Sequence, residues 1–402
     1  MKIAYSVIAI AFAAWLLTNV DQSLFGYVIP QIQTEFGLGL EGIGYIISLS
    51  FVAGMILPVG IGVLTDRFGA RLTLPLCLFV SAVLVGMQGL LTGLYAFALA
   101  RILSFAFSAA LSPITNSIVA TAAPVKWRAI WVALLQCAYP LGWLVSAMVV
   151  APLIEHISWR SLFFVGFIIA PIALILGYLL PKDMFGVATA PSRRVESTTA
   201  RPFAALFAPE FRKRTALLSL AFFSYSGAVA STAFYLPTFL HEVRGYSLPD
   251  AAIIVGSGYG ISVIGYLGSA VVSTYLLPLR TTIVIWNVLA ALLVTIMIWL
   301  PTSFWQDFLA FAVMGIFYFG TAAILITYVL ESFPDDMRTT AAAVCGTACV
   351  SAAMALFPTI VAILVPSLGW QVTFTAIITP CLIISALATL SLKGADQLFR
   401  GT

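Results

Sequence analysis

Apolar runs of about twenty residues recur along the whole chain, and they restrict its fold more than any other feature. The 402 residues are 62% hydrophobic and 8% charged, with a mean hydropathy of +1.09. An ordinary soluble domain is about half apolar and a quarter charged. A run of about twenty apolar residues is long enough to cross the hydrocarbon core of a bilayer as one helix. The composition therefore excludes an ordinary soluble domain and predicts an integral membrane protein.

The residue types in these runs indicate helices. Ala, Leu, Ile, Phe and Gly predominate, and polar and apolar residues do not alternate as they do in an outer-membrane β-barrel. We therefore expect an all-α membrane protein with twelve transmembrane helices. The predicted spans are residues 4–30, 42–64, 73–94, 96–120, 129–152, 161–181, 213–239, 249–277, 281–300, 306–330, 339–365 and 371–392.

The loops between these spans differ sharply in charge. Because successive spans alternate in direction, the loops form two sets on opposite sides of the membrane. One set comprises both termini and the loops near 66–71, 122–128, 182–212, 278–280 and 331–338, and it holds sixteen of the nineteen Lys and Arg residues. Lys and Arg accumulate in the cytoplasmic loops of membrane proteins. We expect both termini in the cytoplasm and the protein in the cytoplasmic (inner) membrane.

Three short patterns occur twice, about 210 residues apart, beside equivalent spans. Pro124-x-x-x-Arg128 recurs as Pro334-x-x-x-Arg338, Trp159-x-x-x-Phe163 as Trp370-x-x-x-Phe374, and the segment 30–35 as 237–242. The repeats indicate two pseudo-symmetric six-helix bundles, and the predicted domains are 1–181, a cytoplasmic linker at 182–212, and 213–402. Duplicated transporters of this kind bind their cargo at the midplane between the halves, and one half rocks against the other.

Two isolated charges lie inside the predicted spans. Arg101 is the one charged residue between Leu72 and Val125, and Asp21 is the one charged residue between Ile3 and Ile29. Each costs about 2.5–3.5 kcal/mol at the centre of a membrane helix. Counted at 1.5 Å per residue, both lie about 9–13 Å from the outer end of their spans, so they can pair. A structural salt bridge between two spans is the alternative to a functional pair.

The chemistry of the two charges suits an anion and a proton. Arginine binds a carboxylate with two parallel hydrogen bonds and keeps its charge. A carboxyl group holds its proton more strongly when buried and less strongly beside a cation. We expect a proton that reaches Asp21 to release Arg101 for an anionic substrate, which couples the two cargoes.

The loop between the second and third spans carries a distinctive spacing. Residues 60–71 read GIGVLTDRFGAR, and this resembles the signature loop G-x-L-x-D-R-x-G-x-R of the major facilitator superfamily. The resemblance implies a twelve-helix transporter with a cytoplasmic gate motif at Gly62, Asp66, Arg67, Gly69 and Arg71. We expect Gly62 to allow a close helix approach and Gly69 to permit a tight turn. An ordinary cytoplasmic loop explains Arg67 and Arg71 but not the whole spacing.

Four further stretches resemble the organic-anion symporters of that superfamily, its anion:cation and aromatic-acid:proton branches. They are Asn19-Val-Asp21-Gln22, Ala100-Arg101-Ile-Leu-Ser104, Gln136-Cys-Ala-Tyr139-Pro-Leu-Gly142 and Ser158-Trp159-Arg160-Ser-Leu-Phe163. The resemblance implies that Asp21 takes the coupling proton and Arg101 grips the substrate carboxylate. The chain departs from some members at Ser108, where they carry Glu, and from the aromatic-acid branch in having a single Asp in its first span.

Other polar residues of the spans are candidate substrate ligands. Tyrosine offers a ring to an apolar body and a hydroxyl to its polar end, although each of these residues is alternatively an interhelical packing residue. The candidates are Gln136, Tyr139, Tyr225, Tyr235, Tyr259, Tyr318 and Thr321. The set is poorer in hydrogen-bonding groups than a sugar site requires, which favours a small carboxylate.

The sequence thus predicts a secondary active transporter for the proton-coupled uptake of a small organic anion (a monocarboxylate, aromatic acid or sugar acid) by alternating access. The first alternative is a proton-driven efflux antiporter for apolar or drug-like compounds, whose G-P-x-x-G-G kink residues 139–142 half match. A second is a receptor without flux, but the linker is too short to hold a soluble domain. An enzyme is not expected, and no cofactor, metal or nucleic acid is expected as a ligand. The resemblance implies a monomer in the lipid bilayer.

Overall fold

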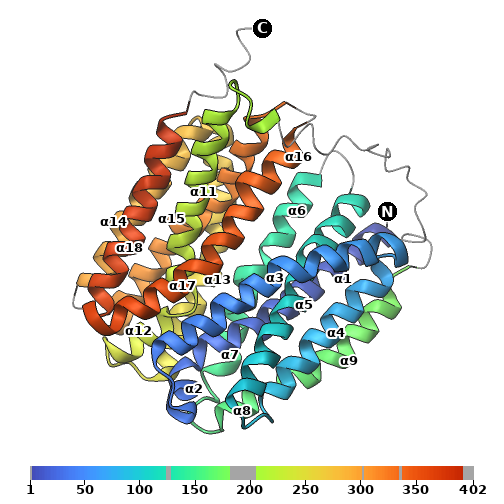
Figure 1. The fold of residues 1–402 in the computed structure, drawn as a ribbon, viewed down its shortest axis with the longest axis vertical. Helices are drawn as coiled ribbons and strands as arrows, with labels where there is room; N and C mark the ends of the chain where they lie inside the picture. Colours follow the sequence, from blue (N-terminus) through green and yellow to red (C-terminus); the bar gives the residue numbers. More distant parts are fainter. Residues whose placement is uncertain (1, 124–127, 182–204, 301–302, 335–336, 393–402) are drawn as a thin grey trace. The chain divides into compact units, whose positions relative to one another are not determined.

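The computed structural model describes residues 2–123, 128–181, 205–300, 303–334 and 337–392, and the regular elements in these residues are helices (Figure 1). The first part of the chain forms α1 (Lys2–Tyr27), α2 (Ile29–Phe36), α3 (Leu40–Phe68), α4 (Ala70–Gln88), α5 (Leu94–Ala122), α6 (Arg128–Gln136), α7 (Ala138–Val150), α8 (Trp159–Leu162) and α9 (Val165–Leu179). The second part forms α11 (Arg212–Ala233), α12 (Leu236–Glu242), α13 (Leu248–Tyr275), α14 (Leu279–Trp299), α15 (Phe304–Glu331), α16 (Arg338–Ala341), the π-helix η2 (Ala342–Ala348), α17 (Cys349–Leu368) and α18 (Trp370–Leu390).

These helices match the twelve expected spans. Among the described residues, eleven helices are long and apolar enough to cross a membrane, and a shorter apolar helix covers Leu134–Val150. That shorter helix lies within the fifth expected span, which is divided into α6 and α7 at Cys137. The all-α membrane fold predicted from the sequence is confirmed.

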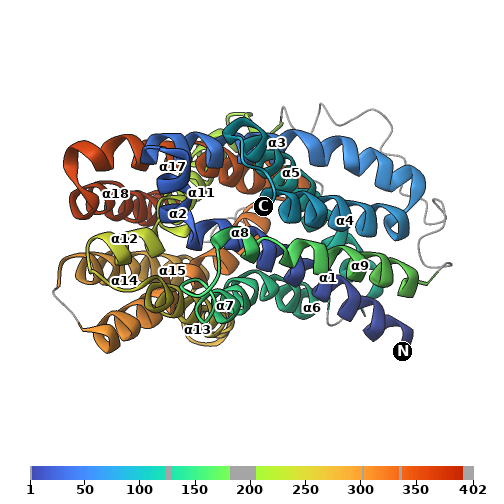
Figure 2. The same cartoon turned by 90° about the horizontal axis from the view of Figure 1, so that it is seen from below.

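By its internal contacts the chain divides into two compact units. Unit 1 comprises Met1–Ser192 and Phe234–Gly256, and unit 2 comprises Arg193–Ala233 and Ser257–Thr402. Within unit 1, α4 packs against α5 and α9, while α5 also contacts α1 and α3 (Figure 2). Within unit 2, α11 packs against α17 and α18, and α14 against α15 and α18. The expected linker falls largely on residues outside the described ranges, so the predicted domain boundaries stay a prediction.

Small residues allow helices of each unit to approach closely. A Cβ atom added to Gly166 of α9 would overlap the main-chain oxygen of Ala82 in α4, and one added to Gly265 of α13 would overlap that of Ile316 in α15. Small residues at helix interfaces let backbones come together in membranes, where packing replaces the hydrophobic driving force. Gly166 is therefore a packing residue of unit 1, and Gly265 of the eighth span is a packing residue of unit 2.

The repeated tryptophan pattern adopts the same local geometry in both units. The rings of Trp159 and Phe163 lie 5.7 Å apart at 82°, and those of Trp370 and Phe374 lie 5.4 Å apart at 72°. The next residue reaches a carbonyl group beyond the end of a neighbouring helix or in its last turn. Arg160 donates to Leu91 O at 2.5 Å, and Gln371 donates to Ile298 O at 3.4 Å. The first pattern thus connects the start of α8 with the segment after α4, and the second connects the start of α18 with the end of α14.

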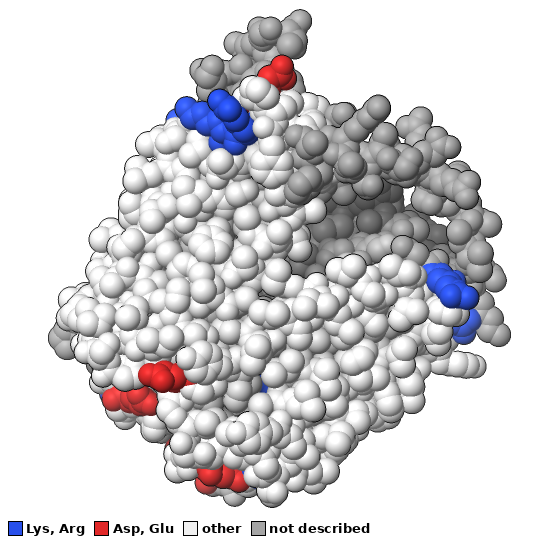
Figure 3. All heavy atoms as spheres, viewed as in Figure 1, with Lys and Arg blue, Asp and Glu red and all other residues white. Residues whose placement is uncertain are grey.

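The surface is dominated by apolar side chains. Large areas of the face in Figure 3 carry no Lys, Arg, Asp or Glu. Exposed Leu, Ile, Val, Phe and Tyr side chains occur on most of the long helices. An exposed apolar surface of this extent is typical of a protein that is solvated by lipid.

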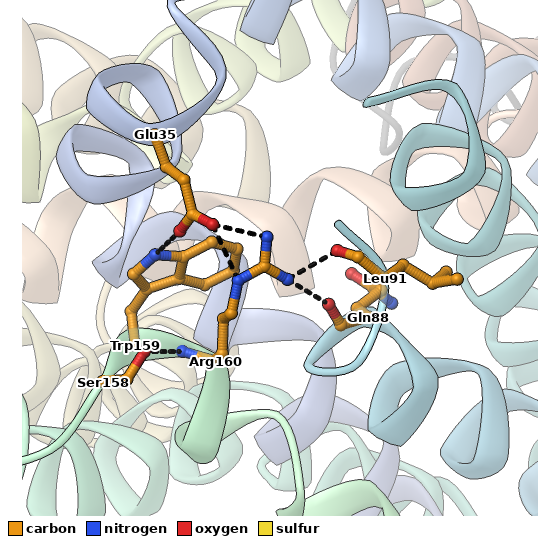
Figure 4. A network of polar contacts seen from close by, with 6 residues as sticks. All are labelled: Glu35, Gln88, Leu91, Ser158, Trp159 and Arg160. Atoms are coloured by element: carbon orange, nitrogen blue, oxygen red, sulfur yellow. Dashed lines mark hydrogen bonds and ion pairs between the residues drawn. The ribbon is translucent and has the colours of Figure 1, made fainter. Parts of the chain in front are cut away.

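One polar cluster of unit 1 connects two short helices with the end of α4 (Figure 4). Arg160 of α8 donates to the Glu35 carboxylate of α2 through Nε at 2.9 Å and Nη2 at 2.6 Å. Trp159 Nε1 donates to the other Glu35 oxygen at 2.7 Å. Besides Leu91 O, Arg160 Nη1 contacts Gln88 O at 3.5 Å, so one guanidinium joins α2, α8 and the end of α4.

Candidate functional site

The two isolated charges both lie inside unit 1. Asp21 of α1 is 0% exposed and Arg101 of α5 is 1% exposed. Arg101 is among the largest fully buried side chains of the described residues. Neither residue faces outward, so each charge must be balanced by groups inside the protein or by a ligand.

The Arg101 guanidinium is bound by a neutral residue of α1. Nη1 donates to the side-chain oxygen of Gln22 at 2.9 Å, and Nη2 donates to the Gln22 main-chain oxygen at 3.4 Å. The guanidinium carbon lies 4.5 Å from the centre of the Phe25 ring and 5.8 Å from that of Phe105, close enough for cation–π attraction. The Nε atom has no hydrogen-bond partner in the described residues. The fork of Arg101 is therefore occupied, but not by an anion.

Asp21 is the neighbour of Gln22 in the chain, yet it is not bonded to Arg101. Both of its carboxylate oxygens are buried and lack a hydrogen-bond partner within the part of the chain that the structure describes. Of the ion pairs within 4.0 Å between described residues, the Glu35–Arg160 pair is present and no Asp21–Arg101 pair is. Arg101 reaches α1 at Gln22, the residue next to Asp21, so the two charges are near each other as expected. The two charged groups do not form a direct salt bridge.

A chain of hydrogen bonds holds the Gln22 amide in one orientation. Its nitrogen donates to Ser81 Oγ of α4 at 3.4 Å, and Ser81 Oγ donates to Ser104 O of α5 at 3.0 Å. Since the single hydroxyl proton of Ser81 is committed to Ser104, Ser81 can only accept from Gln22. The amide oxygen of Gln22 must then point to Arg101. Gln88 reaches the Ser104 hydroxyl from the other side at 3.3 Å.

Sequence analysis missed Gln22 as a site residue. It appeared only as part of the stretch that begins at Asn19, and its polarity beside Asp21 in an apolar run was the available signal. Which of these two side chains faces α5 depends on the rotation of α1. A span without regular alternation of polar and apolar residues does not reveal that rotation.

The other candidates of unit 1 lie on α6, on α7 and directly before α12. Gln136 is half-buried and donates to Asn116 Oδ1 of α5 at 3.3 Å. Tyr139 is half-buried, with its ring centre 6.5 Å from that of Trp143. Tyr235, the residue before α12, is 0% exposed. None of the three is bonded to Arg101 in the described residues, and their roles as substrate ligands stay predictions.

The candidates of unit 2 form an internal cluster. Tyr225 of α11 donates its hydroxyl to Tyr318 O of α15 at 2.9 Å, and the Tyr318 hydroxyl lies 3.0 Å from Thr232 Oγ1. The Tyr259 ring of α13 lies 4.7 Å from that of Phe319. Thr321 donates to Phe317 O of its own helix at 3.0 Å. These contacts join α11, α13 and α15 and give unit 2 a buried group of hydroxyls and rings without a charge of their own.

The loop that resembles the signature motif is the turn between α3 and α4. Gly69 has φ of 83°, as expected of a tight turn, and Thr65 Oγ1 contacts Thr73 Oγ1 across it at 3.0 Å. Arg67 is exposed and Arg71 is partly exposed, while nothing is described of the Asp66 side chain. A Cβ atom at Gly62 would meet no atom of the described residues within 4 Å, so the structure shows no close helix approach there and the role expected of Gly62 stays a prediction.

The chain is similar to bacterial transporters of organic acids. It is 26% identical over 272 residues to the hexuronate transporter of Bacillus subtilis (strain 168), which covers 67% of this chain and 64% of that protein. It is 22% identical to the niacin transporter NiaP of Acinetobacter baylyi over 84% of this chain and 82% of that protein. It is 24% identical to the 4-hydroxybenzoate transporter PcaK of the same organism over 61% of this chain and 60% of that protein. The chain thus spans a little under two thirds of two of these relatives.

Solved structures and a family model agree on the fold. The structure of a D-xylose–proton symporter aligns with a TM-score of 0.77 over 98% of both chains at 16% identity. An inward-facing bacterial homologue of the lysosomal transporter Spinster aligns with a TM-score of 0.76 over 96% of this chain and 95% of that chain, also at 16% identity. The model of the Major Facilitator Superfamily matches residues 10–358. This family consists of membrane transporters and not of enzymes, and the chain belongs to it.

Proposed function

We propose that this protein imports a small organic anion together with protons. The cargo is a monocarboxylate, aromatic acid or sugar acid, bound through its carboxylate at Arg101, and Asp21 carries the coupling proton. The two units alternate the access of this site between the two sides of the membrane. The observation that carries the proposal is the buried guanidinium of Arg101, whose hydrogen-bond and cation–π partners among the described residues are all neutral.

The burial of Arg101 supports an anionic cargo. A guanidinium taken out of water loses a large solvation free energy, which a single amide and two aromatic rings do not fully restore. A carboxylate offers two parallel charge-assisted hydrogen bonds, about twice as strong as neutral ones. An anion that enters the site therefore gains more from Arg101 than a sugar or an apolar compound does.

Asp21 supports the proton. It is 0% exposed, and its carboxylate has no hydrogen-bond partner in the described residues. Burial of an unpaired carboxylate favours its protonated form, and the nearby Arg101 opposes this until an anion neutralises the guanidinium. Binding of the acid and of the proton then favour each other, which is the requirement for symport.

The relatives support the cargo class. The hexuronate, niacin and 4-hydroxybenzoate transporters are named for carboxylic acids or their anions. A cis,cis-muconate transport protein of Acinetobacter baylyi and a gallate transporter of Pseudomonas putida are also among the similar proteins, at 23% identity each. The bodies of these acids differ widely while the carboxylate is common to all, in keeping with one fixed arginine.

The charge of the loops supports the orientation. In the predicted topology, sixteen of the nineteen Lys and Arg residues belong to the set of loops that includes both termini. We place the protein in the cytoplasmic (inner) membrane with both termini in the cytoplasm. It acts as a monomer, in which each copy contains a complete Asp21–Arg101 site.

The proposal is tested with purified protein in liposomes. Vesicles with an inward proton gradient are given radiolabelled 4-hydroxybenzoate, nicotinate, galacturonate or cis,cis-muconate, and xylose serves as the uncharged control. We expect at least one acid to accumulate against its gradient, and lowering the external pH from 7.5 to 5.5 to raise its uptake because protons are a co-substrate. Asp21→Asn should abolish accumulation but retain exchange of labelled for unlabelled acid.

Three results would contradict the proposal in different ways. If the same gradient empties preloaded vesicles, the protein is an exporter, the alternative that its partial likeness to efflux transporters at 139–142 suggests. Uptake of xylose but of no acid would reject the cargo class. Uphill uptake by Asp21→Asn would show that the coupling proton is carried elsewhere.

A further inference from the structure

The Gln22 amide occupies the position at Arg101 that a carboxylate would take. A carboxylate and a side-chain amide are planar groups of similar size, and both present an oxygen to a guanidinium nitrogen. Gln22 contributes its side-chain oxygen to Nη1 and its main-chain oxygen to Nη2, so a single residue fills both prongs of the fork. The amide is neutral, so its bonds are weaker than those of a carboxylate.

The surroundings make this bond easy to exchange. The main-chain contact is long at 3.4 Å, and the hydrogen bond that the amide nitrogen donates to Ser81 Oγ is equally long at 3.4 Å. Ser81 donates its hydroxyl proton to Ser104 O, so it can only accept a hydrogen bond from Gln22. If the Gln22 amide flipped, its nitrogen would lose the bond to Ser81 Oγ. Gln22 is thus oriented towards Arg101 and held there mainly by one bond, the 2.9 Å contact between Nη1 and the amide oxygen.

Gln22 also lies where it separates the two charges. Asp21 precedes it on α1, and Arg101 reaches α1 at Gln22 rather than at Asp21. A direct pair between Asp21 and Arg101 would satisfy both groups and leave no reason for either to bind cargo. An amide on the guanidinium keeps Arg101 solvated without neutralising it.

We propose that the Gln22 side-chain amide is a built-in placeholder, which a substrate carboxylate displaces from Arg101 and which therefore sets the affinity of the site for organic anions. This inference rests on the proposed function and adds a specificity-determining residue to it. The Ser81–Ser104 pair holds the amide ready to return when the anion leaves.

The test changes the placeholder in two opposite directions. Affinity is measured for the acid among 4-hydroxybenzoate, nicotinate, galacturonate and cis,cis-muconate that binds the purified wild-type protein most tightly. Gln22→Glu installs a tethered carboxylate on the fork, and it should weaken binding at pH 7.5 by about tenfold or more, because a tethered competitor acts at a millimolar or higher local concentration. Gln22→Met keeps the length but removes both polar atoms of the side chain.

Gln22→Met is made in an Asp21→Asn background, so that Arg101 cannot close onto Asp21. There the acid no longer has to displace the side-chain amide, and binding should tighten by about tenfold relative to Asp21→Asn alone, the equivalent of one hydrogen bond to a charged group. Gln371→Met, the same chemical change in unit 2, should leave the affinity within twofold. Thermal unfolding and gel filtration confirm that each variant is folded.

The inference requires both changes, in opposite directions. A residue that only fills space would weaken binding in both variants, and a direct substrate ligand would do the same; either pattern overturns it. If neither variant changes the affinity while Arg101→Lys abolishes binding, the placeholder is wrong and the proposed function stands. If the wild type, or Asp21→Asn alone, binds no acid, the assigned roles of Arg101 and Asp21 fail and the inference fails with them.

Discussion

The guanidinium of Arg160 should contribute more to the stability of unit 1 than the ion pair in which it takes part. Glu35 is 40% exposed, so its pair with Arg160 is screened and contributes about 0.2–1 kcal/mol. The Arg160 bond to Leu91 O, at 2.5 Å, joins a charged donor to a main-chain carbonyl and contributes about 1.5–3 kcal/mol. The contact to Gln88 O, at 3.5 Å, is too long to add much.

Two substitutions separate these contributions. Glu35→Gln keeps an acceptor for Trp159 and should lower the free energy of unfolding by at most about 1 kcal/mol. Arg160→Met removes the carbonyl bonds as well and should lower it by about 2–4 kcal/mol. The assay is denaturant titration of the purified protein in mixed micelles, and Gln371→Met, which removes one long bond of 3.4 Å in unit 2, is the control. Equal losses from the two substitutions would refute this division of the cluster's stability.

Three further expectations concern the site, the packing and the turn between α3 and α4. Arg101→Lys should raise the dissociation constant for a bound acid by about tenfold or more, because an ammonium group cannot make two parallel bonds, and an unchanged constant in equilibrium binding would point to a purely structural arginine. Gly265→Ala should destabilise the protein by about 1–3 kcal/mol through overlap with α15, whereas Gly268→Ala, where a Cβ meets nothing within 4 Å, should be neutral or stabilising in the same titration. Asp66→Asn should slow transport several-fold without changing affinity; an unaltered turnover in liposomes would argue against a gate at this turn.

Much of the fold follows from local features of the sequence. The length and apolarity of each run set the helices, and Gly69 marks the turn between α3 and α4 through its positive φ. The repeated Trp159 and Trp370 patterns indicated a duplicated unit, and the two patterns adopt similar ring geometry. The role expected of Gly62 stays a prediction, because a glycine in a motif shows that a side chain is absent without showing which helix lies opposite.

The candidate site was only partly predictable. Its two charges stood out because ions are rare and costly in apolar spans. The group that binds Arg101 did not, because its contact with Gln22 joins residues 79 positions apart. Such a contact depends on the depth and rotation of α1 against α5. Most residues of both helices are apolar on every side, so the sequence leaves that rotation undetermined.

The sequence by itself predicted twelve membrane-spanning segments, indicated which of its loops carry the positive charge, and singled out Asp21 and Arg101, both of which are buried. These properties depend on the free energy of transferring each segment from water to lipid, which is a sum of contributions from residues that are neighbours in the sequence. Only the tertiary structure decided that Gln22 rather than Asp21 holds Arg101, and that Arg160 joins α2, α8 and the end of α4. These contacts depend on how the helices pack side by side. Rotating a helix about its axis by the angle of one residue brings a different side chain to face the neighbouring helix.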